Sequence, residues 1–285
     1  MDIDTAIRHV AELWPEFLER IAGAADDEIR ALEEAIRRPL PRSYRSFLAR
    51  MGGDDAGFAA GFAGDDFRLE TLLAHYQHAS WGVPRPLLLV GLNHVVGEAQ
   101  VHTCLTDAPA NDPRVVYAVL RGGVVDQTLP AAQSLGELVF RYGFCNFFAF
   151  RLQTEGWGQL LHPDAAQIAR LERRLAAAGL ARHPASEGYA AYFVSDGLVA
   201  HYTHAPGDER LILLVHGQEV PVRAVMTDLT REVGLAVSWI GDTVDQHSHL
   251  QADVASGEDE DEDEEYDEYD EFEDDDDSGE LPRSS

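Results

Sequence analysis

The chain has 285 residues, of which 45% are hydrophobic, so it can build a sizeable core in one large or two modest domains. Its formal net charge of −29 disfavours direct nucleic-acid binding, which needs a basic patch to contact phosphates. Lysine is absent, which excludes Schiff-base chemistry on a lysine and a phosphate-binding P-loop.

The sequence favours a cytoplasmic protein. No apolar run approaches the roughly 20 residues of a transmembrane helix. Asp2 and Asp4 stand where a secretory signal carries bases. The two cysteines, Cys104 and Cys145, form no Cys-x-x-Cys pair, so we expect small buried side chains, with neither a disulfide nor a zinc site.

Helices dominate the beginning of the chain. Apolar residues recur at helical spacing from Ile7 to Ile21, and Gly23 is placed to end that helix. A second helix is expected at 26–36, where three acids begin it and suit the helix dipole. A third should start with Pro41 in its first position and end at 52–53, where two glycines can adopt a left-handed conformation.

A change of hydrophobic period to two then predicts strands. After a short helix near 69–76, we expect strands at 87–91, 99–105, 114–120 and 124–129. Ser134 is placed to cap a further helix. The aromatic-rich run 141–148 is interpreted as core, or alternatively as a partner-docking patch. Strands joined in order by short turns imply an antiparallel sheet, and hence an α+β domain over 1–151.

A smaller α+β domain is predicted over 156–241. Asp164 is a good N-cap for a helix that continues to Gly179. Asp196-Gly197 is the strongest hairpin signal in the chain, and strands should flank it at 188–195 and 198–204. A third strand at 210–216, a helix at 222–233 and a short strand at 235–240 should complete the domain.

Residues 242–285 are predicted to be a disordered acidic tail. The segment 258–277 contains 17 acids and no base, so it repels itself and cannot bury enough apolar surface to fold. Tyr266, Tyr269 and Phe272 recur within it at three-residue spacing. Two interpretations stay open: a solubilising tail, or an acidic and aromatic segment that competes for a basic groove.

One stretch resembles a known family. A helix over 29–36, the segment Pro39-Leu40-Pro41-Arg42-Ser43-Tyr44-Arg45-Ser46-Phe47-Leu48 and the pair Gly52-Gly53 are similar to the opening signature of the SUKH superfamily. The resemblance extends loosely over residues 26–148. It implies a non-enzymatic α+β binding module. Bacterial members often serve as immunity proteins that neutralise toxins, many of them nucleases, and fungal relatives regulate cell-wall synthesis.

The candidate partner-binding residues are mostly acidic. Asp54, Asp55, Asp65 and Asp66 lie in a Gly/Asp-rich segment and could face a basic toxin domain, whose binding they would accelerate electrostatically. The alternative is an ordinary solvated loop. Trp81 and Glu98, within the SUKH-like region, complete the expected set. The spacing of the four aspartates does not match an EF-hand, so no calcium site is expected.

No catalytic residue, metal site or cofactor is predicted. The chain has no Gly-x-Ser-x-Gly nucleophile motif, and its glycines lack the order of a nucleotide loop. The SUKH resemblance, together with the acidic balance and the missing catalytic motifs, implies as the leading hypothesis a non-enzymatic immunity protein that occludes a protein partner without binding nucleic acid or membrane. The alternatives are a cytoplasmic regulatory scaffold with no toxin partner and a metal-assisted hydrolase that uses His201, His204 or His216.

Overall fold

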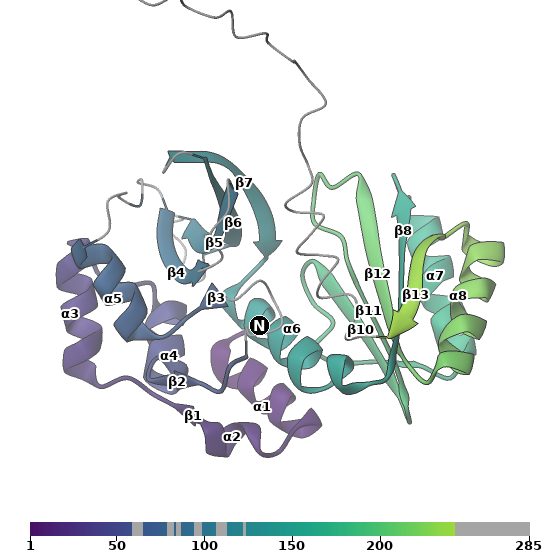
Figure 1. Ribbon diagram of the computed structural model, residues 1–285, viewed down its shortest axis with the longest axis horizontal. Coiled ribbons are helices and arrows are strands. Elements are labelled where there is room, and N and C mark those ends of the chain that lie inside the picture. The colour runs from purple at the N-terminus through teal and green to yellow at the C-terminus, as the bar shows by residue number, and fades with distance from the viewer. Residues whose placement is uncertain are drawn as a thin grey trace, which may run out of the picture.

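The computed structural model describes residues 1–58, 65–78, 83, 87–93, 99–106, 113–121 and 124–242. The fold is α+β with antiparallel sheets, as predicted. Helix α6 (Leu135–Phe147) lies at the centre, between an N-terminal half on the left of Figure 1 and a C-terminal half on the right. No helix among the described residues is long and apolar enough to cross a membrane.

The N-terminal half places helices below a five-stranded antiparallel sheet of order β3-β4-β5-β6-β7 (Figure 1). A small two-stranded ribbon, β1-β2, lies among the helices. The helices are α1 (Ile3–Leu13), α2 (Phe17–Arg20), α3 (Asp26–Ile36), α4 (Arg42–Met51) and α5 (Leu69–His78). The strands are β1 (Ile21–Ala22), β2 (Asp54–Asp55), β3 (Asp65–Asp66), β4 (Leu87–Asn93), β5 (Ala99–Thr106), β6 (Val115–Arg121) and β7 (Val124–Ala132).

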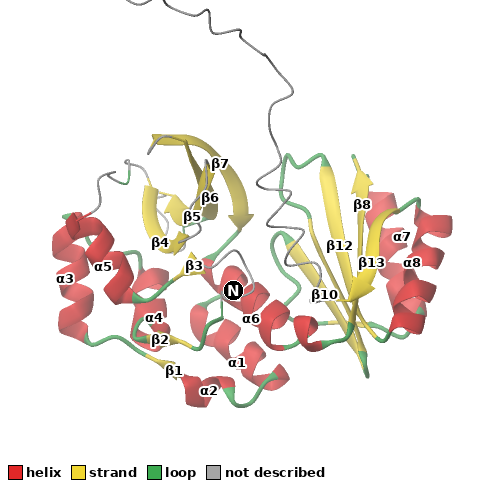
Figure 2. Ribbon diagram, viewed as in Figure 1, coloured by secondary structure: helices red, strands yellow, loops and turns green. Residues whose placement is uncertain are grey.

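The C-terminal half is a six-stranded antiparallel sheet of order β13-β8-β12-β11-β10-β9. Helices α7 and α8 cover one face, and α6 lies on the opposite side (Figure 2). A turn η1 (Ala149–Arg151) connects α6 to the sheet. The other elements are β8 (Thr154–Leu161), α7 (Ala165–Ala177), β9 (Ala181–Arg182), β10 (Ala190–Ser195), β11 (Leu198–Thr203), β12 (Arg210–Gly217), α8 (Glu219–Val233) and β13 (Ala236–Asp242).

Three expectations about helix ends are wrong. The first helix ends at Leu13, because Trp14 precedes Pro15 and is extended (φ −143°, ψ 90°), which is the conformation favoured before proline. The glycines at 52–53 do not form a left-handed end: Gly52 is right-handed (φ −70°). Gly52 is needed for space instead, since a Cβ there would lie 2.6 Å from the Leu48 carbonyl oxygen. Pro41 precedes the helix as its N-cap rather than occupying its first position.

The main element missed from sequence is β8. It lies between β12 and β13 and pairs with both, yet its glycines weaken the strand pattern. Gly156 faces α8, and a Cβ there would lie 2.8 Å from Met226 Cγ. Gly158 faces Leu235 in the same way, with 2.9 Å to Leu235 Cδ2. The glycines therefore allow close packing of α8 and its C-terminal connection onto the sheet.

Helix α6 belongs to the cores of both halves. Twelve of its 13 residues are buried, so its aromatic run is core rather than a docking patch. On one side Gly143 makes room for α1, since a Cβ there would lie 2.5 Å from Val10 Cγ2. On the other side the rings of Phe140 and Phe144 lie 4.8 and 4.9 Å from that of Tyr192 on β10. A single hydrophobic cluster thus runs from α1 through α6 to β11.

A buried carboxylate fixes the same junction. Glu137 of α6 is 2% exposed and accepts hydrogen bonds from the backbone N–H groups of Gln133 and Tyr189, both at 2.7 Å. Burial raises the pKa of Glu137, and these two bonds oppose that effect. Gly188 has φ +66° and lies so close that a Cβ would be 2.1 Å from Glu137 Oε2. The loop before β10 is therefore held directly against α6.

Truncation after Arg151 is expected to prevent folding of the N-terminal half. It would expose the face of α6 that covers β10, and a large apolar side chain such as Phe140 or Phe144 loses about 1.5–3 kcal/mol on exposure. Soluble yield and urea unfolding followed by circular dichroism measure this effect. A control chain ending at Asp242 keeps every described element and should match the full-length midpoint. A cooperative transition of the 1–151 chain at that midpoint would contradict the shared core.

Candidate functional site

The structure brings Asp55 and Asp66, two of the predicted acidic residues, close enough for their charges to interact. Asp54 and Asp55 form β2, which pairs with β1, and Asp65 and Asp66 form β3, which pairs with β4. Burial raises the pKa of Asp55, and the negative charges of Asp66 and Asp54 raise it further. Trp81 and Glu98 lie outside the described residues.

The four carboxylates are engaged within the fold. Asp54 and Asp55 each accept a backbone N–H two residues on, from Ala56 and Gly57, at 2.8 Å. Asp65 Oδ2 accepts the Thr103 hydroxyl at 2.8 Å. Only Asp54 is exposed. All four side chains therefore stabilise local structure before any partner is present, and three of them are also at least partly buried.

Asp66 has the strongest such interactions. Its carboxylate accepts hydrogen bonds from the Arg68 guanidinium at 2.6 Å and from the Thr71 hydroxyl at 2.7 Å. Burial raises the pKa of Asp66, but these bonds and the Arg68 charge outweigh it and hold the pKa at about 2. Asp66 is ionised at neutral pH, and its charge is largely compensated by Arg68.

A second group of polar side chains forms a row beneath α6, which we call the buried row: Cys145, His201, His216 and Glu155. Cys145 Sγ lies 3.6 Å from His201 Nε2. The rings of His201 and His216 stack nearly parallel, with centroids 5.8 Å apart. His216 Nδ1 lies 3.3 Å from Glu155 Oε2. The row therefore crosses from α6 over β11 and β12 to β8.

The buried row is neutral at pH 7. Burial raises the pKa of Glu155 to about 8 and lowers that of His201 to about 3, to which the Arg141 charge contributes. Burial also lowers the pKa of His216 well below its ordinary value and raises that of Cys145. Both carboxylate oxygens of Glu155 and both ring nitrogens of His216 lack hydrogen-bond partners among the described residues. The ionised forms would be costly here, because nothing solvates them.

The buried row contains two of the three candidate hydrolase histidines, and neither of them is exposed. His201 and His216 are 4% and 0% exposed, so a substrate cannot reach either ring in this conformation. The Cys145 thiol is equally enclosed, and a raised pKa disfavours the nucleophilic thiolate. His204 lies apart from them, with Nε2 3.3 Å from the Asp208 carbonyl oxygen.

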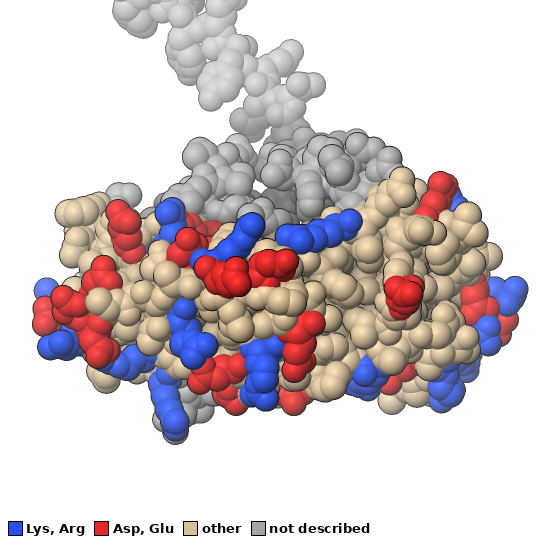
Figure 3. Space-filling model, turned by 90° about the horizontal axis from the view of Figure 1, so that it is seen from below, with Lys and Arg blue, Asp and Glu red and all other residues tan. Residues whose placement is uncertain are grey.

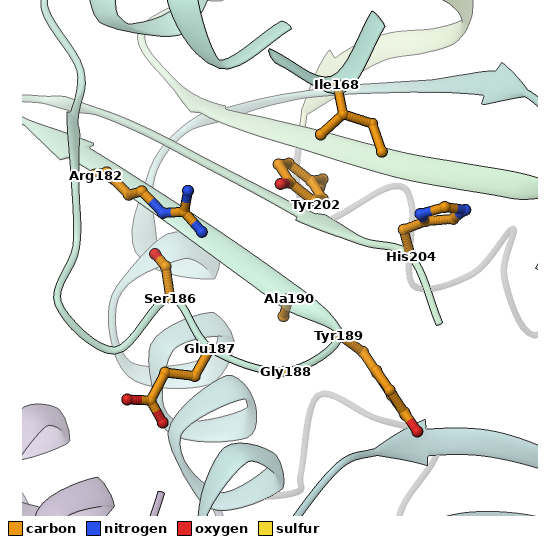
Figure 4. A pocket seen from close by; sticks show the side chains of 9 residues that line it. All are labelled: Ile168, Arg182, Ser186, Glu187, Gly188, Tyr189, Ala190, Tyr202 and His204. Atoms are coloured by element: carbon orange, nitrogen blue, oxygen red, sulfur yellow. The ribbon is translucent and has the colours of Figure 1, made fainter. Parts of the chain in front are cut away.

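A small polar hollow of about 210 Å³ opens beside β9 and β11 (Figure 4). Its charged groups already have partners: Arg182 donates to Glu172 at 3.0 Å, and Glu187 lies 3.4 Å from the amino group of Met1. The Tyr202 hydroxyl also donates to Glu172, at 2.8 Å. Ligand pockets usually have volumes of about 300–1,000 Å³. The hollow is therefore small for a substrate site and offers no uncompensated charge.

One group of described residues has the side chains of a metal site. His9 and Glu12 of α1 and His183 before β10 place one ligand atom each within 4.8 Å of the others. The Ala185 N–H donates to His183 Nδ1 at 3.1 Å, so the ring proton lies on Nε2. The ring stacks on Phe140, with centroids 5.0 Å apart. In this tautomer His183 Nδ1 accepts the Ala185 N–H and Nε2 carries the ring proton, so neither nitrogen offers a free lone pair to a metal. The group therefore fits a junction between the halves better than a metal site.

Sequence reasoning missed these groups for a topological reason. Glu155 lies on β8, for which no strand was predicted, and a strand there would have aligned Glu155 with His216 on β12. His183 and His9 come from opposite halves of the chain, and no local spacing links them. Only the alternation of β11 and β12 could have indicated that His201 and His216 share a face.

Replacing Glu155 with glutamine is expected to stabilise the protein above neutral pH. The folded state holds a proton on Glu155 that the unfolded chain releases above its ordinary pKa of 4.5. Stability is therefore lost as pH rises from about 4.5 to 8. The variant escapes this loss, and its advantage at pH 8 should be on the order of 4 kcal/mol, since one pKa unit corresponds to about 1.4 kcal/mol.

The measurement is urea unfolding from pH 5 to pH 8.5. The advantage of E155Q should be small at pH 5 and should grow with pH. Glu34 is exposed on α3, and E34Q provides a matched control that should follow the parent protein throughout. An E155Q advantage that does not depend on pH would contradict a protonated, buried Glu155.

Comparisons with protein-family models, with curated proteins and with solved structures find no match to this chain. The resemblance to the SUKH superfamily therefore rests on the helix over 29–36, the segment 39–48 and the glycines that follow.

Proposed function

We propose that this protein is a non-enzymatic binding module that occludes a protein partner, and specifically an immunity protein that neutralises a toxin, as the SUKH resemblance implies. The observation that carries the proposal is the edge strand β7. Strand β7 ends the five-stranded sheet and is paired by β6 alone among the described strands. An unpaired edge can accept an extended segment of a partner through backbone hydrogen bonds.

The exposure of β7 is unusual for a strand of a packed sheet. None of residues 124–130 is buried, whichever side of the strand the side chain is on. Val124 is 69% exposed and Leu129 is 46% exposed. A single covered face would give alternating burial, which is absent here. The strand therefore presents both a hydrogen-bonding edge and apolar side chains to a partner.

The charge of the protein favours a basic partner. The net charge is −29, and the acids are most concentrated in segment 258–277. On the face seen in Figure 3, acidic and basic side chains are interspersed rather than gathered in one patch. A negatively charged binder accelerates its encounter with a positively charged partner, such as a nuclease domain with a phosphate-binding groove.

The alternative functions have weaker support. A metal-assisted hydrolase would need His201 or His216 to meet a substrate, and both rings are enclosed. A regulatory scaffold could use the same strand, so the identity of the partner separates it from an immunity protein. An assay with a candidate toxin, the product of the neighbouring gene, therefore tests the leading proposal directly.

The substitutions Val124→Arg and Leu129→Arg are expected to abolish protection against that toxin. They remove apolar contacts worth about 1.5–3 kcal/mol for each buried side chain and add charge that repels a basic partner, so affinity should fall at least about tenfold. Val220 on α8 is 79% exposed, and V220R is the matched control that should protect normally. Rescue of growth on co-expression and co-purification at low salt are the measurements.

Two results would oppose the proposal. If the toxin is neither retained nor neutralised by the parent protein, the immunity function fails. If the parent protein protects but V124R/L129R protects equally well, β7 is not the docking edge.

A further inference from the structure

Trp14 marks the place where α1, α2 and η1 meet. Its ring stacks on Phe147 at a centroid distance of 4.2 Å and is 6% exposed. This packing ties the end of α1 to the end of α6. The indole is therefore a fixed platform at the surface boundary between the two halves.

Two arginines converge on this platform from distant parts of the chain. The guanidinium carbon of Arg20, at the end of α2, lies 5.1 Å from the Trp14 ring centre, and that of Arg151, in η1, lies 4.9 Å from it. Such distances allow cation–π attraction. Both side chains belong to exposed residues. Two like charges held by one ring repel each other unless an anion lies between or beside them.

Neither arginine has an ion pair with another described residue, whereas Arg45, Arg68 and Arg174 each have at least one. The nearest acids in sequence, Glu16 and Glu19, are exposed and form no ion pair with Arg20 or Arg151 among the described residues. The pair therefore keeps its capacity for charge-assisted hydrogen bonds with a carboxylate.

We propose that the carboxylates of this protein's own acidic segment, Glu258–Asp277, dock on Arg20 and Arg151 above Trp14. The end of β13 lies beside this site, because Asp242 pairs with Thr154, three residues after Arg151. The 15 residues 243–257 join that point to the segment and can span up to about 50 Å when extended. The linker is therefore long enough for the acidic segment to reach the two arginines.

The segment suits this platform chemically. It has 17 carboxylates within 20 residues, so many registers place two acids against the two arginines. Tyr266, Tyr269 and Phe272 can stack on the planar guanidinium groups. A single exposed ion pair contributes only about 0–1 kcal/mol. Tethering compensates for this weakness, because a short flexible linker gives an effective concentration in the millimolar range.

The platform is built from α1, α2 and η1 and includes no residue of β7. The two proposals can therefore fail independently of each other.

Paramagnetic relaxation enhancement in the full-length chain tests the docking. A nitroxide attached at Ser278→Cys labels the end of the segment selectively, because Cys104 and Cys145 are both buried. Loss of amide signal is expected around residues 14–20 and 150–152. The loss should disappear at 1 M salt, where the Debye length is about 3 Å compared with about 10 Å at 0.1 M.

Charge variants identify the partners of the segment. The double variant R20E/R151E should remove the broadening, and R173E, at an exposed arginine on α7, should retain it. If charge reversal perturbs folding, R20Q/R151Q and the salt series in the parent chain answer the same question. Broadening that is absent, or that persists unchanged in the double variant, overturns the proposal. Broadening that arises only between a labelled and an unlabelled molecule also overturns it, since the contact would then be intermolecular.

Discussion

The burial of α6 between two sheets is the constraint on which the rest of the structure depends. A helix that is buried on nearly all sides needs partners around it, and here α1 supplies one side while β10 and β11 supply another. Glycine at 143 permits the approach of α1, and Glu137 anchors the loop that leads into β10. Each half of the chain is therefore completed by the other, although each has its own sheet.

The same burial explains the neutral polar row beneath α6. Once α6 covers β11 and η1 covers β12, any polar residue on that face is removed from water, and its ionised form becomes costly. His201 and His216 respond with lowered pKa values, and Glu155 with a raised one. A perturbed pKa often indicates an active site. Here the groups are enclosed by the fold, so packing is a sufficient explanation of their shifted pKa values.

Local chemistry was predictable from sequence, and long-range packing was not. The cap at Ser134, the N-cap at Asp164 and the hairpin at Gly197 (φ +76°) were all expected, because each depends on residues within one turn. Strand β8 was missed because its glycines make room for Met226 and Leu235, which lie far along the chain. The aspartates of β2 and β3 were predicted as a charged surface, but backbone amides and Arg68 engage them in ways that sequence does not reveal.

The position of β8 has a consequence for how the chain folds. Thr154 pairs with Gly217 on one side and with Asp242 on the other, so β8 gains both neighbours only after some 60 to 90 further residues have been synthesised. Pairings this distant in sequence form slowly, since the entropy of closing a long loop must be overcome first. The face of α6 that contacts β10 and β11 likewise stays uncovered until those strands have been synthesised. The nascent N-terminal half therefore leaves the ribosome with an apolar helix face uncovered, which makes it a natural client for chaperones during synthesis.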